Sequence, residues 1–245
     1  IDDLGHAVPW FSEYFSKKNG VVFFRHLHAR SLKGQVSLPL RIIITDLEKM
    51  YPLIYRKWIF ITESNSSIED LSNLGINKER IFKIPPGVDT NFFRPGKKTD
   101  FPSIIYFGGM RDYKRPWDSI YAFKEVLKKY REARLYIVGT GPSLGRVRNL
   151  AKSMNLLENI SFMGRLSNED LASLISSSWI NIHCSVTEGF GYSIIESSAS
   201  GTPTVAYTVP GVSEAIKDGE NGILVRDGDP KELSFGLIKI IESYP

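Results

Sequence analysis

Cysteine is nearly absent from this sequence, since Cys184 is the only thiol among its 245 residues. A single cysteine excludes a disulfide within the chain, and its apolar surroundings predict a buried, reduced thiol. Long apolar runs are also missing, so no segment is predicted to cross a bilayer as a helix. No secretory signal is recognisable at the start. Together these absences predict a cytoplasmic protein.

Charge of one sign is not in large excess either. The chain has 31 Lys and Arg against 27 Asp and Glu, a formal net charge of +4. This balance permits an anionic ligand but gives no reason to expect nucleic acid as a partner. An apolar content of 42% and a charged content of 24% are ordinary for a soluble globular protein.

Apolar periodicity predicts alternating strands and helices from residue 104 onward. The expected strands are 104–107, 135–138, 160–163, 180–184, 204–207 and 223–225. The expected helices are 116–130, 144–154, 168–177, 193–200, 213–217 and 230–243. Such alternation is typical of a parallel sheet with helices on both faces.

The first part of the chain predicts a smaller unit of the same kind. Strands are expected at 21–24, 58–62 and 81–84, and helices over residues 40–51 and 67–74. We therefore predict an α/β fold with two Rossmann-like parallel-sheet domains, the first incomplete. The predicted domains are residues 1–94 and 95–245, and residues 95–102 are the candidate linker.

The segment from Trp10 to Lys18 has an aromatic face and a basic end. It predicts a helix with two alternatives for that face. We favour a helix whose aromatic face packs against the core. The second alternative is a peripheral contact with a membrane surface.

The most informative stretch for function is Glu188-Gly-Phe-Gly-Tyr-Ser-Ile-Ile-Glu196. It is predicted to be a glycine turn between a strand and a helix. Amide groups in the first turn of a helix lack internal partners and carry the positive end of its dipole, which favours anions. Glu188 and Glu196 flank that turn, and a carboxylate can accept two hydrogen bonds from a diol. This pattern suits a sugar nucleotide, although a solvated glutamate pair on an ordinary turn fits the residues as well.

This stretch resembles the E-x7-E signature of retaining, family 4 glycosyltransferases of the GT-B fold. The similarity continues, in the family's order, through residues 201–205, 211–214 and 218–225. The resemblance implies transfer of a sugar from a UDP- or GDP-sugar to a sugar, lipid or protein-linked acceptor, with retained anomeric configuration and no further cofactor. In the family the reaction is thought to occur on one face of the sugar, with the leaving phosphate assisting the acceptor.

The resemblance also implies roles for residues of this turn. Glu188 would position the sugar hydroxyls, and Glu196 would hold the ribose. The turn between them would line the donor through Gly189, Phe190, Gly191, Tyr192 and Ser193, and the amides at Gly191 to Ser193 would stabilise the diphosphate.

Residues 108–114 resemble the family's phosphate-binding G-R-x4-K turn. Lys114 matches the lysine, but Gly109 stands where the arginine is normally found. Arg111 could supply the missing charge, or it could simply be exposed to solvent. The turn Gly139-Thr-Gly141-Pro resembles the family's V-G-x-G-P turn, for which we expect a structural role.

Two further positions correspond to donor contacts in the family. Gly164-Arg165-Leu166 lies where members hold the base, although Arg165 could be a surface charge. His26 follows the strand 21–24, in the place of a histidine that faces the donor sugar. A surface histidine in a loop is the alternative for His26.

The tripeptide Asp227-Gly228-Asp229 has the form of the D-x-D motif, which binds metal in another class of glycosyltransferases. It precedes Pro230 and follows the last expected strand, where Asp and Gly commonly form turns. We therefore predict turn residues here and no metal site.

Compared with complete members of the family, the chain lacks a recognisable first strand with a glycine loop and a C-terminal crossover helix. We therefore expect a glycosyltransferase or a fragment of one. The alternative is a non-catalytic nucleotide-sugar-binding module or partner subunit.

Overall fold

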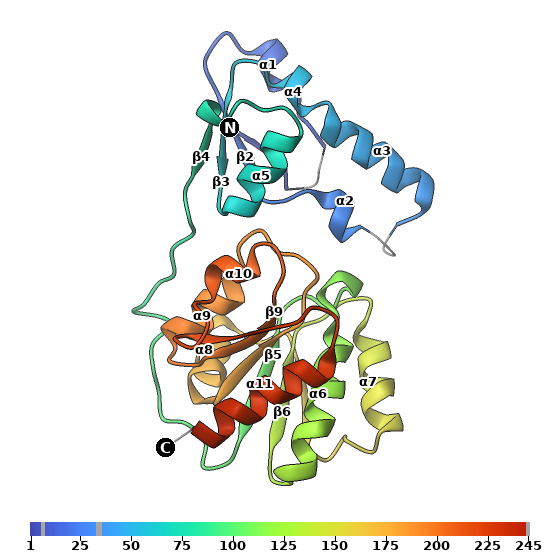
Figure 1. Ribbon diagram of the computed structural model, residues 1–245, viewed down its shortest axis with the longest axis vertical. Coiled ribbons are helices and arrows are strands. Elements are labelled where there is room, and N and C mark those ends of the chain that lie inside the picture. Colours follow the sequence, from blue (N-terminus) through green and yellow to red (C-terminus); the bar gives the residue numbers. More distant parts are fainter. Residues whose placement is uncertain (6–7, 33–35, 244–245) are drawn as a thin grey trace. The chain divides into compact units, whose positions relative to one another are not determined.

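The chain folds as two units, each built around its own parallel sheet (Figure 1). The computed structural model describes residues 1–5, 8–32 and 36–243, and residues 29–30 by their backbone only. The first unit comprises Ile1–Pro86 with Thr187–Phe190, and the second comprises Gly87–Val186 with Gly191–Pro245. The predicted α/β class with two parallel sheets is confirmed.

The first unit has four parallel strands in the order β1-β2-β3-β4. They are β1 (Asp2–Asp3), β2 (Val21–Phe24), β3 (Ile59–Thr62) and β4 (Ile81–Lys83). The helices are α1 (Ser12–Phe15), α2 (His28–Ser31), α3 (Leu38–Lys49), α4 (Tyr51–Ile54) and α5 (Asn65–Asn73). Aromatic side chains dominate the core, where the buried rings of Tyr55 and Phe60 meet edge-on at 5.9 Å.

The prediction of a core-facing helix between Trp10 and Lys18 is wrong. Only the four residues of α1 are helical, and none of them is buried. Phe11 stands just before the helix at φ 56, in the left-handed region. A single helical turn cannot present an apolar face long enough to cover a sheet, and the aromatic side chains remain on the surface.

The second unit has six parallel strands in the order β10-β9-β8-β5-β6-β7. They are β5 (Ser103–Phe107), β6 (Arg134–Val138), β7 (Ile160–Gly164), β8 (Ile180–His183), β9 (Thr204–Tyr207) and β10 (Gly222–Val225). The α-helices are α6 (Pro116–Lys129), α7 (Leu144–Ser153), α8 (Asn168–Ser177), α9 (Tyr192–Ala199), α10 (Val212–Ala215) and α11 (Pro230–Ser243).

Helices cover both faces of this second sheet. Helices α6, α7 and α11 pack side by side on one face (Figure 1). On the other face, Ile175 of α8 is buried against Ile105 and Phe107 of β5. Because helices cover both faces of the sheet, all five residues of the central strand β5 are buried. Within the described residues, no helix combines the length and apolar character needed to cross a membrane.

The division between the units falls at Pro86 and Gly87, earlier than the predicted boundary after residue 94. Phe93 packs against the core of the second unit, so the segment before residue 95 belongs there. The predicted linker, residues 95–102, is also fixed to the second unit. Lys98 Nζ donates to the Ser178 carbonyl and the Thr202 hydroxyl, both at 2.7 Å, and Trp179 donates to the Thr99 carbonyl.

Candidate functional site

The strand order of the second unit creates a switch point between β5 and β8. From β5 the chain adds β6 and β7 on one side, and then returns to add β8, β9 and β10 on the other. In open parallel sheets, ligands bind outside the carboxyl ends of the strands at such a point. Most of the predicted donor contacts lie in the segments that follow β5 and β8 at this point.

The turn after β5 contains the predicted phosphate residues. Lys114 ends a short 3-10 helix (Asp112–Lys114), with its ammonium 5.3 Å from the centre of the Tyr113 ring. Arg111 is exposed. Gly109 is also exposed, and a Cβ atom added there would meet no described atom within 4 Å. The turn therefore has room for a side chain to begin at position 109.

The turn after β6 supports the turn after β5 through two glycines. Gly139 and Gly141 have φ values of 129° and 151°. A Cβ atom on Gly139 would lie 2.0 Å from the Gly108 carbonyl oxygen, and one on Gly141 would lie 2.5 Å from that of Met110. A backbone hydrogen bond from Met110 N to Thr140 O, at 3.0 Å, completes the contact. The predicted structural role of both glycines is confirmed.

Arg115 is a residue that the sequence analysis missed. It follows Lys114 in the left-handed conformation, at φ 43, and is the N-cap residue directly before α6. Its guanidinium donates to the Cys184 carbonyl at 3.1 Å and forms an ion pair with Asp227. It also lies 4.6 Å from the centre of the Tyr207 ring. Arg115 thus ties the turn after β5 to the chain leaving β8.

Three of the residues around Arg115 are buried, namely Asp118, Cys184 and Tyr207. The Tyr207 hydroxyl donates to Asp118 Oδ2 at 2.9 Å. Burial raises the pKa of Asp118, against the opposing effects of that hydrogen bond and of Arg115. Burial likewise raises the pKa of the Cys184 thiol. Cys184 is a free, fully buried thiol, as predicted.

Helix α9 begins directly after Gly191, at the switch point. This glycine has φ 87, and a Cβ atom on it would lie 2.8 Å from the end of the Ile194 side chain. Tyr192 is exposed in the first turn, and the Ser193 hydroxyl lies 3.2 Å from Nδ1 of the buried His183. The first-turn amides of this helix therefore face the carboxyl edge of the sheet, as an anion site requires.

Glu196 lies one turn further along α9 and is partly buried. Burial raises the pKa of its carboxyl group from 4.5 to about 7, and no charged neighbour among the described residues adds to or opposes this shift. A partly buried carboxylate without a cationic partner is destabilised when ionised. Hydrogen bonds from ligand hydroxyl groups would relieve that destabilisation.

The remaining predicted residues are divided between the two units. Arg165 is exposed after β7, and Leu166 packs on the core cluster that contains Ile105. Glu188, Gly189 and Phe190 belong to the first unit, as does His26.

His26 is held in a stacked pair and is not a freely exposed loop residue. Its ring lies 4.9 Å from that of His28, at an interplanar angle of 27°. The His28 ring approaches the Gly5 carbonyl at 3.0 Å, and its backbone N–H donates to the buried Glu48 at 2.6 Å. The turn after β2 therefore places His26 in a defined position.

The carboxylates of the Asp227-Gly228-Asp229 tripeptide serve the turn before α11. Asp227 pairs with Arg115, while Asp229 pairs with Arg226 and accepts the Lys231 N–H at 3.0 Å. The hydrogen bond from Arg226 lowers the pKa of Asp229. Within the described residues, no group of three or more His, Cys, Asp and Glu converges to hold a metal.

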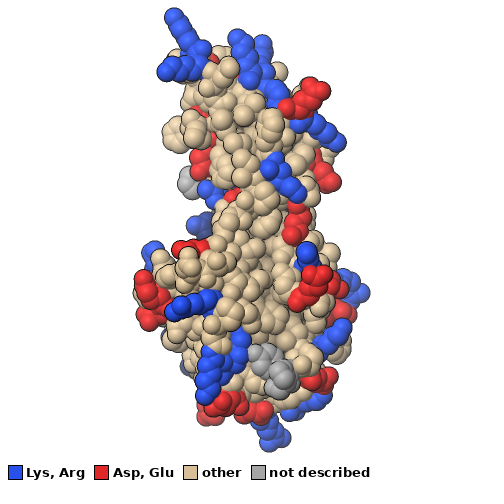
Figure 2. Space-filling view, turned by 90° about the vertical axis from the view of Figure 1, so that its left-hand side faces the viewer, with Lys and Arg blue, Asp and Glu red and all other residues tan. Residues whose placement is uncertain are grey.

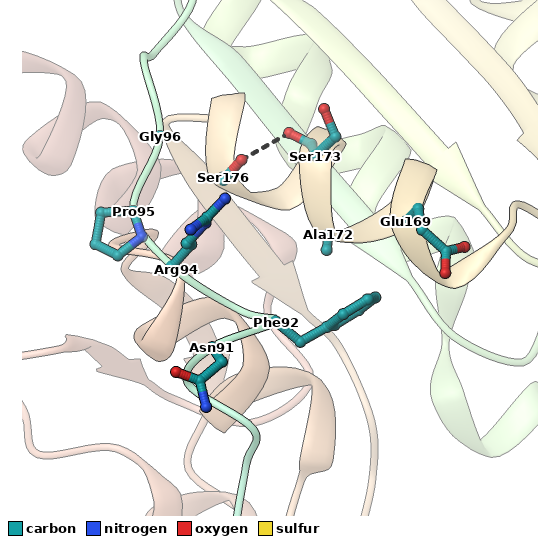
Figure 3. Close-up of a pocket in the computed structure, with 9 residues that line it drawn as sticks. All are labelled: Asn91, Phe92, Arg94, Pro95, Gly96, Glu169, Ala172, Ser173 and Ser176. Carbon is teal, nitrogen blue, oxygen red and sulfur yellow. Dashed lines mark hydrogen bonds between the residues drawn. The ribbon is translucent and has the colours of Figure 1, made fainter.

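One hollow of the second unit lies away from the residues predicted to bind the donor. It has a volume of about 690 Å³ and runs along α8, between Phe92 and Arg94 on one side and Glu169 and Ser176 on the other (Figure 3). None of the predicted donor-binding residues lines it. The positions of the β5 and β8 turns, and not the size of a hollow, therefore define the candidate site.

Residues 87–245 match the family described as "Glycosyl transferases group 1". D-inositol 3-phosphate glycosyltransferase of Acidothermus cellulolyticus is 28% identical, over 98% of this chain and 60% of its own length. Sucrose-phosphate synthase of Thermosynechococcus elongatus has a similar structure, with a TM-score of 0.80 and 23% identity over 95% of this chain and 61% of its own. Anabaena HepE, solved with UDP and glucose, has a TM-score of 0.76 and 18% identity over 94% of this chain and 64% of its own. The chain thus spans less than two thirds of each of these proteins.

Proposed function

This chain belongs to the group 1 glycosyl transferases, and we propose that its second unit binds a UDP- or GDP-sugar for transfer to an acceptor with retained anomeric configuration. The observation that carries the proposal is the switch point between β5 and β8. There the lysine turn and the start of α9 leave neighbouring strands at one edge of the sheet. The partly buried Glu196 follows one turn along the same helix.

The nucleotide would be held by groups of the second unit. Lys114 and the first-turn amides of α9 would offset the negative charge of the diphosphate. The Glu196 carboxylate would accept hydrogen bonds from the two ribose hydroxyls. The backbone at Arg165 and Leu166 would contact the base. HepE, which is similar in fold, was solved with UDP, and this supports UDP as the first nucleotide to test.

Glu188 and His26 would act on the sugar. As the bond between the anomeric carbon and the diphosphate breaks, positive charge develops on the sugar and negative charge on the leaving group. Lys114 and the α9 amides would stabilise that negative charge. The acceptor hydroxyl would form the new bond on the same face and give its proton to the departing phosphate oxygen, so no separate carboxylate nucleophile is required.

The acceptor would be a sugar, or a lipid- or protein-linked group, and a peripheral membrane contact would bring the chain to a lipid-linked one. A non-catalytic binding module is not favoured, because the relative matched along nearly the whole chain is named as a glycosyltransferase. Cytoplasmic localisation stays a prediction.

Calorimetric titration with UDP and GDP tests the proposal directly. We expect saturable binding of at least one of them. Lys114→Ala should weaken binding of the diphosphate more than binding of uridine or guanosine, because a nucleoside has no phosphate. Absence of binding by both nucleotides at millimolar concentration would show that the site is wrongly assigned.

A further inference from the structure

Helix α1 carries its aromatic side chains on the outside of the first unit. Trp10, Tyr14 and Phe15 are 67%, 63% and 88% exposed. Leu53 of α4, which is 57% exposed, lies beside Tyr14, whose hydroxyl donates to the Leu53 carbonyl at 3.3 Å. With Phe11, whose ring centre is 6.3 Å from that of Tyr14, these residues form what we call the α1 patch.

The patch is held in place by contacts of its polar groups with the chain after α4. The Glu13 carboxylate accepts backbone N–H groups of Arg56, Lys57 and Trp58 at 3.0–3.2 Å. The Trp10 backbone N–H donates to the Tyr55 hydroxyl at 3.2 Å. These bonds fix the turn while leaving the aromatic rings outside. The exposure is therefore a property of a folded segment.

Positive charge surrounds the α1 patch. Lys17 and Lys18 follow the helix. Arg56 and Lys57 lie next to it, because their backbone N–H groups donate to Glu13. All four basic side chains are exposed. Figure 2 shows Lys and Arg predominating at this end of the first unit.

Among the described residues, three acidic side chains near the patch have partners that the structure defines. Glu13 faces the backbone amides, and Asp2 is buried and accepts the Tyr55 hydroxyl at 2.9 Å. Asp3 lies 3.5 Å from the Arg25 guanidinium. Amide hydrogen bonds leave the charge of Glu13 in place, so it offsets one of the four basic groups, and positive charge remains in excess around the patch.

We propose that the α1 patch docks on an anionic lipid surface. Tryptophan and tyrosine favour the boundary between water and acyl chains, and phenylalanine favours the region just below it. Lysine and arginine around such a patch are attracted by anionic headgroups, each by about 1 kcal/mol, which is about fivefold in affinity. This proposal deepens the proposed function, on which it rests, by naming the surface on which a lipid-linked acceptor would be reached.

Co-sedimentation of the chain with phospholipid vesicles, without nucleotide, tests the proposal. We expect binding to vesicles of phosphatidylcholine mixed with phosphatidylglycerol, weaker binding to phosphatidylcholine alone, and loss of the difference at high salt. Trp10→Ser combined with Phe15→Ser should abolish binding. Phe235→Ser is the matched control, because Phe235 is 63% exposed on α11 of the second unit and should have no effect.

A second pair of variants tests the charges. Lys17→Ala with Lys18→Ala should weaken binding to the anionic vesicles by about 25-fold, from two charges at about fivefold each. Lys124→Ala with Lys152→Ala removes two exposed charges from the second unit and should leave binding unchanged. Thermal unfolding followed by circular dichroism confirms that every variant is folded.

Three results would overturn the proposal. One is failure of the unmodified chain to bind anionic vesicles, and another is equal loss of binding in the Phe235→Ser control. The third is self-association in sedimentation velocity that Phe15→Ser abolishes, since a second copy would then cover the patch. UDP titration of the same variants separates this proposal from the donor site, because the patch variants should bind UDP as the unmodified chain does.

Discussion

Replacing Glu196 by glutamine separates two properties of the candidate site in one experiment. Glutamine keeps the size of the side chain and one acceptor oxygen but cannot ionise. In the unliganded protein, burial raises the Glu196 pKa from 4.5 to about 7. The substitution should therefore alter both the pH dependence of stability and the pH dependence of nucleotide binding.

The expected sign for stability follows from the raised pKa. Below the ordinary pKa of 4.5 the carboxyl group is protonated in both states, so the unmodified protein and the Glu196→Gln variant should differ little in stability. Between pH 4.5 and about 7 the unfolded chain ionises first, so the unmodified protein loses stability as pH rises. Above pH 7 the loss reaches at most about 3 kcal/mol, reduced by solvent screening of a partly exposed group. Glu196→Gln should abolish this loss, as measured by urea unfolding at about pH 5 and pH 8.

The affinity for the nucleotide should change with pH in the opposite direction to the stability, and rise as the Glu196 carboxyl group ionises. In the proposed site two ribose hydroxyls would donate to the ionised carboxylate, so binding should lower the Glu196 pKa and release about half a proton at pH 7. Calorimetry in two buffers with different ionisation enthalpies measures that release. The terminal phosphate of UDP titrates in the same range, so the Glu196→Gln variant supplies the baseline. That variant should also bind UDP about 1–3 kcal/mol more weakly.

The reasoning fails if the unmodified protein and Glu196→Gln release the same number of protons on binding UDP. It also fails if the variant is less stable at pH 8, since Glu196 would then be a structural residue stabilised by its surroundings. Deoxynucleotides provide an independent check. UDP that lacks the 2′ and 3′ hydroxyls should bind both proteins equally.

Three other changes test the turns around the site. Gly109→Arg should tighten UDP binding in calorimetry, since it adds a positive charge to the phosphate turn and its Cβ atom would meet no described atom within 4 Å; if Arg111 already supplies this charge, Arg111→Ala should instead weaken binding as much as Lys114→Ala. Arg115→Lys should lower the free energy of unfolding by about 2 kcal/mol in urea, because one ammonium nitrogen cannot stand in the places of both Nε, which bonds the Cys184 carbonyl, and Nη2, which pairs with Asp227; unchanged stability would remove Arg115 from the support of the site. Gly141→Ala should destabilise by about 3 kcal/mol in the same assay, because its φ of 151° and its approach to a backbone oxygen at 2.5 Å both disfavour a side chain; a neutral effect would mean that the two turns can separate.

The second sheet could be predicted closely because its determinants are local. Each predicted strand carries apolar residues, either as a run or in alternation with polar ones, and is followed by a glycine or a polar residue. Helices α6, α8 and α11 begin within a residue of their predicted starts. A proline is the first residue of both α6 and α11. Because proline is favoured at the first position of a helix, the starts of these two helices could be predicted.

The first unit was harder to predict because an aromatic pattern does not specify what it faces. The spacing of Trp10, Tyr14 and Phe15 is the same whether the rings enter a core or meet solvent or lipid. The structure resolves the alternatives through Glu13, whose bonds to the backbone after α4 turn the rings outward. Those partners lie 43–45 residues along the chain, where no local pattern points to them.

Arg115 was missed for the same physical reason, and it shows which part of a site a motif leaves out. Motif residues that touch a ligand keep a fixed spacing, because the ligand fixes their separation. A residue that supports them can bond any carbonyl or carboxylate that the fold brings near, and Arg115 bonds groups 69 and 112 residues away. The only local signals are its place between Lys114 and Pro116 and a left-handed conformation that is uncommon for arginine. A strained residue held by several buried partners is therefore a better indication of such support than its type, because the partners must compensate for the strain.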